Sequence, residues 1–192
     1  SADSSPTLKP GKDWFYPYYR DGAFTTGLGM TAKDQLLAFF AKADDPSSGG
    51  RQMPHHFGKR ELNIVTQSSP TGTQYLQAVG CGMACKLNRE KEVVYVSSGE
   101  GTTSQGDFHE ALNWASREKL PVIFHIQDNE YAISVHISEQ TSGGSVFSMV
   151  SGYQNLGRFD VDGSDYFETH LAFKKAVDRA RKGKGPAVIV SH

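Results

Sequence analysis

The sequence predicts an α/β protein with a mainly parallel sheet and helices on both faces of that sheet. Apolar runs at 93–96, 121–127, 156–161 and 187–190 have the length of buried strands. The first two runs are continuously apolar rather than alternating, which is typical of parallel strands covered on both faces. Strands and helical segments alternate through this half of the chain, as they do in successive βαβ units.

Helices are expected where apolar residues recur every three or four positions. They cover 31–43, 73–87, 104–119 and a long segment that follows Asp165. Thr31 and Asp34 provide the side chains that cap the first turn of the first helix. Ser104 with Asp107 does the same for the third helix, and Asp165 does so for the last one.

Several apolar side chains are expected to face the interior. The first helix has one apolar side, formed by Leu36, Leu37, Phe39 and Phe40. The last helix is expected to bury Phe167, Leu171, Ala172, Val177 and Ala180. Trp114 and Phe124 are also assigned to the core, because large aromatic side chains are highly buried on average. A short additional strand is predicted at 62–66.

Composition and charge exclude several classes of protein. The chain has 192 residues, the size of one domain. Lys and Arg number 20 against 21 Asp and Glu, so the net charge of −1 lacks the basic excess of a nucleic-acid-binding protein. No apolar run is long enough to span a membrane. Cys81 and Cys85 are too few for a disulfide framework and are assigned to the core.

Residues 1–13 are predicted to form a polar N-terminal tail, and residues 14–192 one α/β domain. The chain does not begin with Met, and only two residues follow the apolar run at 187–190. A buried parallel strand seldom closes a domain. We therefore expect the domain to be truncated at both ends relative to its family.

Glycines and oxygen-bearing side chains follow the first two strands of the alternating block. Gly99, Glu100 and Gly101 follow one strand, and Asn129 follows the next, thirty positions after Gly99. Both loops should leave the same edge of the sheet, where α/β proteins bind ligands. Glycines let the backbone approach a diphosphate, and a helix N-terminus offers it N–H groups. Glu100 and Asn129 carry the oxygen ligands that Mg²⁺ prefers.

The same glycines could instead open a dinucleotide-binding loop of the G-x-G-x-x-G type. Ser104 stands where that motif has its third glycine, which weakens this alternative without removing it. The two interpretations differ in their ligand, which is a nicotinamide dinucleotide in one and a diphosphate bound with Mg²⁺ in the other.

The Gly-Glu-Gly triplet, followed about thirty residues later by an Asn-bearing pair, resembles the signature of thiamine-diphosphate enzymes. The longer run GEGTTSQGDFHEALNWASREKLPVIFHIQDNEYAIS resembles the α subunit of 2-oxo acid dehydrogenases. Glu100, in place of Asp, resembles the branched-chain (2-oxoisovalerate) enzyme rather than the pyruvate enzyme. The segments 50–58, 68–74 and 132–140 agree with this resemblance, which covers nearly the whole chain.

The resemblance implies a fold and a set of site residues. The fold would be the diphosphate-binding half of the thiamine-diphosphate-binding fold. Mg²⁺ would be held by the side chains of Glu100 and Asn129 and by the carbonyl of Tyr131. The cofactor would contact Tyr19, Arg20, Ser69, Thr71, Gly99, Glu100, Gly101, Thr102, Gln127, Asn129, Tyr131, Ala132 and Ile133. A K⁺ ion would be bound by the loop of Ser68, Pro70, Thr73 and Gln74.

One catalytic candidate and three departures from the family pattern stand out. Neighbouring side chains point apart, so at most one of His55 and His56 should face the site, and His56 is the candidate. Gln127 stands where the branched-chain enzyme has an Arg that reaches the diphosphate, so Gln127 is expected within reach of it but without a charge. Asp128 replaces a frequent Asn, and Thr71 replaces a larger apolar residue.

The implied activity is oxidative decarboxylation of branched-chain 2-oxo acids, with acyl transfer to lipoamide. The implied partners are a β subunit, in a heterotetramer of two α and two β chains, and a lipoyl-bearing acyltransferase. The activating glutamate would belong to β, so the isolated chain should be inactive. The location would be cytoplasmic in a bacterium and the mitochondrial matrix in a eukaryote. Alternatives are a pyruvate or acetoin dehydrogenase α subunit, a nicotinamide-binding Rossmann domain, or a non-catalytic interaction domain with the same fold.

Overall fold

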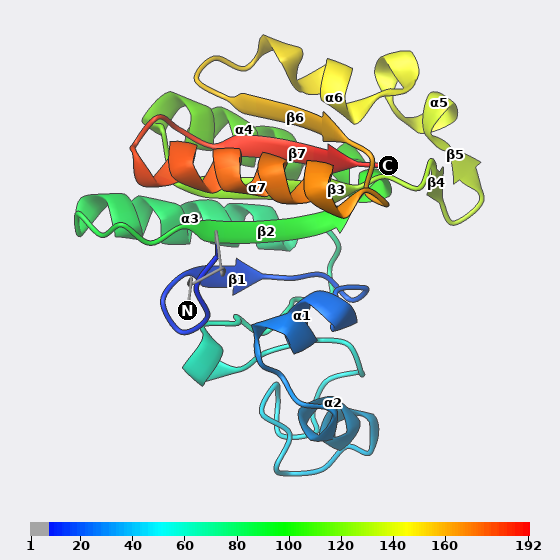
Figure 1. Cartoon of the computed structure of the whole chain (residues 1–192). Helices are drawn as coiled ribbons and strands as arrows, with labels where there is room; N and C mark the ends of the chain where they lie inside the picture. The colour runs from blue at the N-terminus through cyan, green and yellow to red at the C-terminus, as the bar shows by residue number, and fades with distance from the viewer. Residues whose placement is uncertain (1–7) are drawn as a thin grey trace.

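The protein is built around a parallel sheet that lies between two layers of helices. The computed structural model describes residues 8–192, and its five main strands pair in the order β1-β2-β3-β7-β6, all of them parallel (Figure 1). These strands are β1 (Trp14–Tyr16), β2 (Val94–Gly99), β3 (Val122–Gln127), β6 (Gly157–Val161) and β7 (Ala187–Ser191). The predicted α/β fold class is confirmed.

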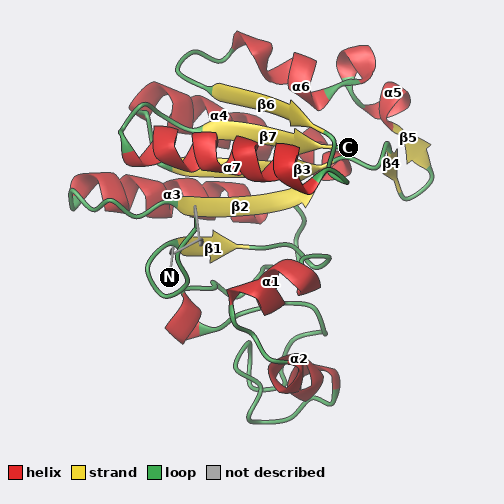
Figure 2. Ribbon diagram, in the orientation of Figure 1, coloured by secondary structure: helices red, strands yellow, loops and turns green. Residues whose placement is uncertain are grey.

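The helices differ greatly in length. The longer ones are α3 (Thr73–Leu87), α4 (Gly106–Glu118) and α7 (Tyr166–Arg181). The shorter ones are α1 (Gly22–Leu28), α2 (Ala32–Phe39), α5 (Ile137–Gln140) and α6 (Val146–Met149). Single 3₁₀ turns lie at Arg60–Leu62, Glu100–Ser104, Ser142–Gly144 and Val150–Gly152. A two-stranded antiparallel hairpin of β4 (Tyr131–Ala132) and β5 (Val135–His136) lies beyond the sheet edge (Figure 2).

Apolar cores fill both faces of the sheet. Val96 and Phe124 point toward α3 and α4, where they belong to one core. Ile123, the neighbour of Phe124, points to the opposite face and packs with α7. Phe15 and Tyr95 join a third cluster on the α7 side, together with Leu28 of α1. Side chains alternate across a strand, so coverage of both faces explains the continuous apolar runs of β2 and β3.

Most predicted elements lie close to their expected bounds. α3 spans 73–87 as predicted, and the Asp165 carboxylate accepts the N–H groups of Phe167 and Glu168 at the start of α7. The capping box of Thr31 and Asp34 is present as well. The helix predicted at 31–43 nevertheless ends at Phe39, because Ala41 adopts a left-handed conformation with φ 48°.

The predicted strand at 62–66 and the predicted cap of the third helix were wrong, and the predicted tail 1–13 is not entirely exposed. The strand predicted at 62–66 is reduced to isolated bridges at Ile64, because Asn63 is left-handed with φ 55°. α4 begins at Gly106 without a side-chain cap, and Ser104 belongs to the preceding 3₁₀ turn. Of the predicted tail 1–13, residues 1–7 lie outside the described part of the chain, and Asp13 is fully buried.

The predicted burial of several apolar residues was also wrong. Leu36, Phe39 and Phe40 of the first predicted helix are 52%, 50% and 68% exposed, and Leu37 is half-buried. In α7, Phe167 and Leu171 are exposed, whereas the small residues Ala172, Ala176, Val177 and Ala180 are buried. Trp114 is 40% exposed, and the Arg117 guanidinium lies over its ring. Helical spacing identifies an apolar side but does not show that another element covers it.

The edge strand β1, which the sequence analysis missed, is held by an ion pair between the fully buried Asp13 and the partly buried Arg181. The Asp13 carboxylate accepts two N–H bonds from Arg181 of α7, at 3.0 and 2.6 Å. It also accepts the N–H of Val93 at 2.9 Å, just before β2. This bidentate geometry ties β1 to the end of α7 and to the neighbouring strand.

We expect Arg181→Ala to lower the free energy of unfolding by about 3–5 kcal/mol, because it leaves the buried Asp13 charge without its cation. Urea denaturation followed by circular dichroism measures this change. Arg117→Ala is the control, since Arg117 pairs with Glu118 on the surface and its loss should leave the urea midpoint nearly unchanged. An Arg181→Ala midpoint equal to that of the unaltered protein would show that the Asp13 pair contributes nothing.

Candidate functional site

Two chain segments with candidate ligands leave the sheet at the same level. β2 and β3 are paired in parallel along their whole length, and the last pair in register is Gly99 with Gln127. The segment that begins with Glu100 and the segment that begins with Asp128 therefore start side by side. This register explains why residues thirty positions apart in the sequence meet at one edge.

A cavity of about 340 Å³ lies at this edge. Four segments form its wall, namely the turn before α1, the loop before α3, the end of β2 with its 3₁₀ turn, and the end of β3 with the hairpin. The lining residues are Tyr18, Tyr19, Arg20, Thr71, Gly99, Glu100, Gly101, Thr102, Gln127, Asn129, Tyr131, Ala132 and Ile133. All the predicted cofactor-contacting residues except Ser69 are thus brought together, and Ser69 lines a neighbouring cavity.

Glu100 has an unusual environment for a carboxylate. It is 2% exposed, and its Oε1 atom has no hydrogen-bond partner within the described residues. Buried charges are normally paired or bound to a metal, because an uncompensated buried carboxylate is costly. The carboxylate therefore suits a divalent cation bound in the cavity that it lines.

Hydrogen bonds from the backbone to the side chains of Asp128 and Asn129 hold the loop after β3 in tight turns. The Asn129 Oδ1 atom accepts the N–H of Tyr131 at 3.0 Å, and Asp128 Oδ1 accepts the N–H of Glu130 at 2.8 Å. Glu130 and Ile133 adopt left-handed conformations, with φ 68° and 59°. An amide oxygen has two lone pairs, so Asn129 keeps one acceptor site for a metal ion.

Gly101 and Ala132 bring the two loops into contact. A Cβ atom on Gly101 would lie 2.7 Å from the Cβ of Ala132, closer than real side chains approach. The Gln140 side chain also donates to the Glu100 carbonyl at 3.4 Å, which links α5 to the same turn. Glycine is therefore required at 101 for the hairpin to close against the 3₁₀ turn.

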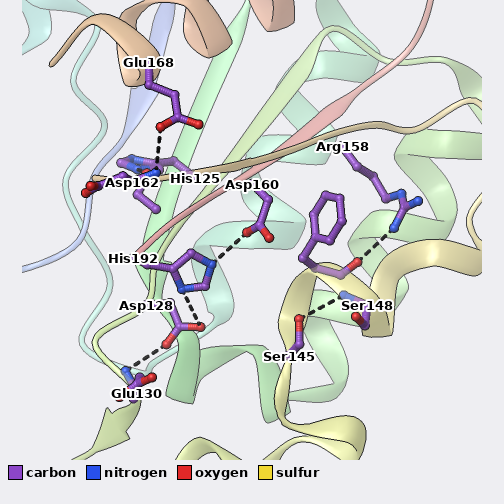
Figure 3. A network of polar contacts seen from close by, with 12 residues as sticks. His125, Asp128, Glu130, Ser145, Ser148, Arg158, Asp160, Asp162, Glu168 and His192 are labelled. Carbon is purple, nitrogen blue, oxygen red and sulfur yellow. Dashed lines mark hydrogen bonds and ion pairs between the residues drawn. The ribbon is translucent and has the colours of Figure 1, made fainter. Parts of the chain in front are cut away.

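The loop after β3 is braced from the adjacent strands. Figure 3 shows His192, after β7, between Asp128 and Asp160. Its Nε2 atom lies 2.7 Å from Asp160 Oδ1, and its Nδ1 atom lies 3.7 Å from Asp128 Oδ2. The backbone N–H of Asp128 donates to the Ser191 carbonyl at 2.8 Å. The Asp128 carboxylate thus faces the imidazole of His192.

The positive charge at the cavity comes from Arg20. Its guanidinium donates to the Tyr19 hydroxyl and lies 4.6 Å from the centre of the Tyr19 ring. Gln127 also lines the cavity, but its Nε2 donates to Asp21 at 2.7 Å and its Oε1 accepts from the Tyr18 hydroxyl at 3.2 Å. The amide nitrogen has a second N–H, so Gln127 can donate to a diphosphate, as expected from the sequence, while it keeps both of these bonds.

A second cavity of about 460 Å³ adjoins the first and holds His56 and Ser69. The Nδ1 atom of His56 lies 3.0 Å from the Met53 carbonyl, which can only accept. Nδ1 therefore carries the proton, and Nε2 accepts the Ser69 hydroxyl at 2.9 Å. His55 lines this cavity too, contrary to the prediction that only one of the pair would, because its φ of 66° breaks the expected alternation.

The loop predicted to bind K⁺ is internally hydrogen-bonded. The Ser68 hydroxyl donates to the Pro70 carbonyl at 3.4 Å. Gln74 is buried, and its amide accepts the N–H of Gly72 at 3.0 Å and donates to the Ser97 carbonyl at 3.3 Å. Thr73 is the first residue of α3. These bonds connect the loop to β2.

Comparison with known proteins identifies the family. Residues 4–191 match the family described as "Dehydrogenase E1 component". The chain belongs to this family. It is 46% identical over 177 residues to the 2-oxoisovalerate dehydrogenase subunit alpha of Bacillus subtilis, covering 92% of this chain and 53% of that protein. It is 38% identical over 174 residues to the mitochondrial 2-oxoisovalerate dehydrogenase subunit alpha of Caenorhabditis elegans, covering 90% of this chain and 40% of that protein. The chain thus spans about half, or less, of the length of these relatives.

A solved structure supports the fold assignment. Transketolase from Campylobacter jejuni superposes with a TM-score of 0.69 at 19% sequence identity, covering 96% of this chain and 30% of that one. At this identity the likeness concerns the fold alone.

Two further features were sought within residues 8–192, namely a cluster of metal-binding side chains and a helix able to cross a membrane. No group of three or more His, Cys, Asp or Glu side chains that could hold a metal ion occurs there, and Cys81 and Cys85 are free thiols. The described helices include none that is both long and apolar enough to cross a membrane.

We expect Gly101→Ala to lower the free energy of unfolding by about 1–3 kcal/mol, because the added methyl group overpacks the contact with Ala132. Ala132→Gly should restore part of this loss in the double variant, since it removes the opposing methyl group. Urea denaturation of the single and double variants measures both effects. A double variant whose loss of stability equals or exceeds the sum of the single changes would contradict the assigned contact.

Proposed function

We propose that this chain forms the diphosphate- and Mg²⁺-binding part of the α subunit of a branched-chain 2-oxo acid dehydrogenase. The observation that carries the proposal is the buried Glu100 carboxylate, whose Oε1 lacks a partner among the described residues and which lines the cavity beside Gly101. The family and the names of the similar proteins support it. The reaction would be oxidative decarboxylation of a branched-chain 2-oxo acid, with transfer of the acyl group to lipoamide.

The cavity residues fit the cofactor that the family implies. Glu100 and Asn129 would hold Mg²⁺ through their side chains and Tyr131 through its carbonyl, with phosphate oxygens completing the shell. Arg20 would pair with the diphosphate. The remaining lining residues would contact the cofactor as the resemblance implies, with Ser69 reaching it from the second cavity. K⁺ would be bound by the loop of Ser68, Pro70, Thr73 and Gln74, which contacts β2 through Gln74.

Thiamine diphosphate, held by these residues, would supply the nucleophilic carbon and the electron sink that decarboxylation of a 2-oxo acid needs. The chain itself binds and orients this group and compensates its charge. In the adjoining cavity, the Ser69 hydroxyl donates a hydrogen bond to His56 Nε2. A proton could pass between these two side chains, so His56 and Ser69 are suited to proton transfer to or from a substrate bound in this cavity. This arrangement makes His56 the proposed catalytic residue of the chain.

The proposed assembly contains two α and two β subunits and works with a lipoyl-bearing acyltransferase. A β subunit would supply the glutamate that activates the cofactor, so this chain alone should not decarboxylate 2-oxo acids. The location would be the cytoplasm of a bacterium or the mitochondrial matrix of a eukaryote. A pyruvate or acetoin dehydrogenase α subunit is the alternative within the family.

A ligand test separates the proposal from a nicotinamide-binding domain. In the full-length protein assembled with its β subunit, thiamine diphosphate with Mg²⁺ should raise the melting temperature, because a ligand that binds only the folded state stabilises it. NAD⁺ should produce no shift. A shift with NAD⁺ and none with thiamine diphosphate would refute the proposal.

We expect Glu100→Ala to abolish Mg²⁺-dependent binding of thiamine diphosphate, and Glu100→Asp to retain part of it. Loss of the carboxylate leaves the charge of the metal and diphosphate poorly compensated, whereas Asp keeps the ligand type at a shorter reach. Calorimetric titration of the assembled enzyme measures the affinity. Glu110→Ala is the control, because Glu110 is an exposed residue of α4. Unchanged affinity in Glu100→Ala would remove Glu100 from the site.

A further inference from the structure

Asp21 lies behind the wall of the first cavity, between the Arg20 turn and the ends of β2 and β3. It is 3% exposed. Its carboxylate accepts the Ser97 hydroxyl of β2, the Gln127 amide of β3 at 2.7 Å, and the backbone N–H of Tyr18 at 3.3 Å. The Tyr18 hydroxyl donates in turn to Gln127, which closes a ring of hydrogen bonds. One carboxylate thus joins three separate parts of the chain.

The orientation of Asp21 is unusual for its place in the sequence. It directly precedes α1, where an Asp side chain commonly caps the first turn of the helix. Asp21 makes no side-chain cap bond and turns toward the strands instead. The helix therefore lacks a stabilising cap bond, and the carboxylate instead accepts hydrogen bonds from Ser97 and Gln127 near the cavity.

Asp21 also closes the turn that carries Arg20. Its backbone N–H donates to the Tyr18 carbonyl at 2.9 Å, and its side chain accepts the Tyr18 N–H, so the turn is bonded at both ends. Arg20 and Tyr19 lie within this turn and both line the cavity. The bonds from Asp21 to β2 and β3 thus fix the turn relative to the strand ends that precede Glu100 and Asn129.

We propose that Asp21 is a positioning residue for the anion pocket, which holds the turn of Arg20 in register with the metal-binding loops. This inference rests on the proposed function, because the anion is the diphosphate of the cofactor. Asp21 does not line the cavity and contributes by fixing Arg20 and Gln127. Arg20 then meets the diphosphate without first having to be ordered, which favours affinity.

The test compares two substitutions in the full-length protein assembled with its β subunit, using thiamine diphosphate with Mg²⁺ as the titrant. Asp21→Ala should raise the Kd about tenfold or more, the effect of losing charge-assisted hydrogen bonds. Asp21→Asn keeps an acceptor for Ser97 and Tyr18, and Gln127 can turn its amide to match the new donor. Its Kd should stay within about threefold of the original value.

Ser97→Ala provides an independent variant, because Ser97 is fully buried and does not line the cavity. It removes one donor to Asp21 and should raise the Kd about threefold or more. If Asp21→Ala does not fold, Ser97→Ala decides the question alone. Asp13→Ala is the control, because the Asp13 carboxylate is also buried but pairs with Arg181 of α7, away from the cavity. This variant should lower the melting temperature without changing the Kd.

Unchanged Kd values in Ser97→Ala and in any folded Asp21→Ala, with only a lowered melting temperature as in Asp13→Ala, would overturn the inference. Equal loss of affinity in Asp21→Asn and Asp21→Ala would overturn it as well, because Asn should rescue a positioning role. Absence of binding by the unaltered protein would instead overturn the proposed function, and the inference with it. The measurement on the unaltered protein therefore separates the two failures.

Discussion

The site depends on the parallel register of β2 and β3. Because Gly99 pairs with Gln127, the two strands end together, and the chain must turn away from the sheet at both points. The 3₁₀ turn after β2 and the wound loop after β3 are then forced into contact, at a distance that only glycine at 101 allows. The turn that carries Arg20 and the loop before α3 form the remaining walls of the cavity.

Two of the buried carboxylates at this edge, those of Asp21 and Glu100, have different surroundings. Burial raises the pKa of Asp21, and hydrogen bonds from Ser97 and Gln127 oppose that rise by stabilising the charged form. Glu100 is equally buried, yet one of its oxygens has no partner in the described part of the chain. The first carboxylate is thus satisfied by the protein, and the second is suited to a cation from outside it. Burial also raises the pKa of the nearby Tyr18 to about 12, so its hydroxyl stays protonated as a donor to Gln127.

The sequence predicted the features that depend on local patterns. The apolar runs of β2 and β3 identified buried parallel strands, the spacing of α3 marked both of its ends, and the Gly-Glu-Gly and Asn positions indicated the sheet edge. β1 was missed because a three-residue strand carries little pattern, and its place is set by the ion pair of Asp13 with the distant Arg181. The exposure of Phe39 and Phe167 was missed because the spacing along a helix does not reveal whether a partner covers it.

The hydrogen bonds of Gln127 could not be predicted either. The sequence shows that position 127 is an uncharged Gln, but it does not show that Asp21, more than a hundred positions away, accepts the Gln127 amide. Asp21 itself carried a visible signal, since it stands beside Arg20 in the Tyr-Tyr-Arg-Asp-Gly segment. The sequence analysis predicted neither the short helix α1 that follows Asp21 nor a role for this carboxylate.

The central claim, that Glu100 and Asn129 hold a divalent cation on a diphosphate, is tested most directly by electron paramagnetic resonance with Mn²⁺ in place of Mg²⁺. In the assembled full-length protein saturated with thiamine diphosphate, we expect one tightly bound Mn²⁺ per α chain, with hyperfine coupling to phosphorus. With thiamine in place of its diphosphate, the phosphorus coupling should vanish and the Mn²⁺ should bind far more weakly. Tightly bound Mn²⁺ without phosphorus coupling, or no bound Mn²⁺ in the presence of the diphosphate, would contradict the assignment of this cavity.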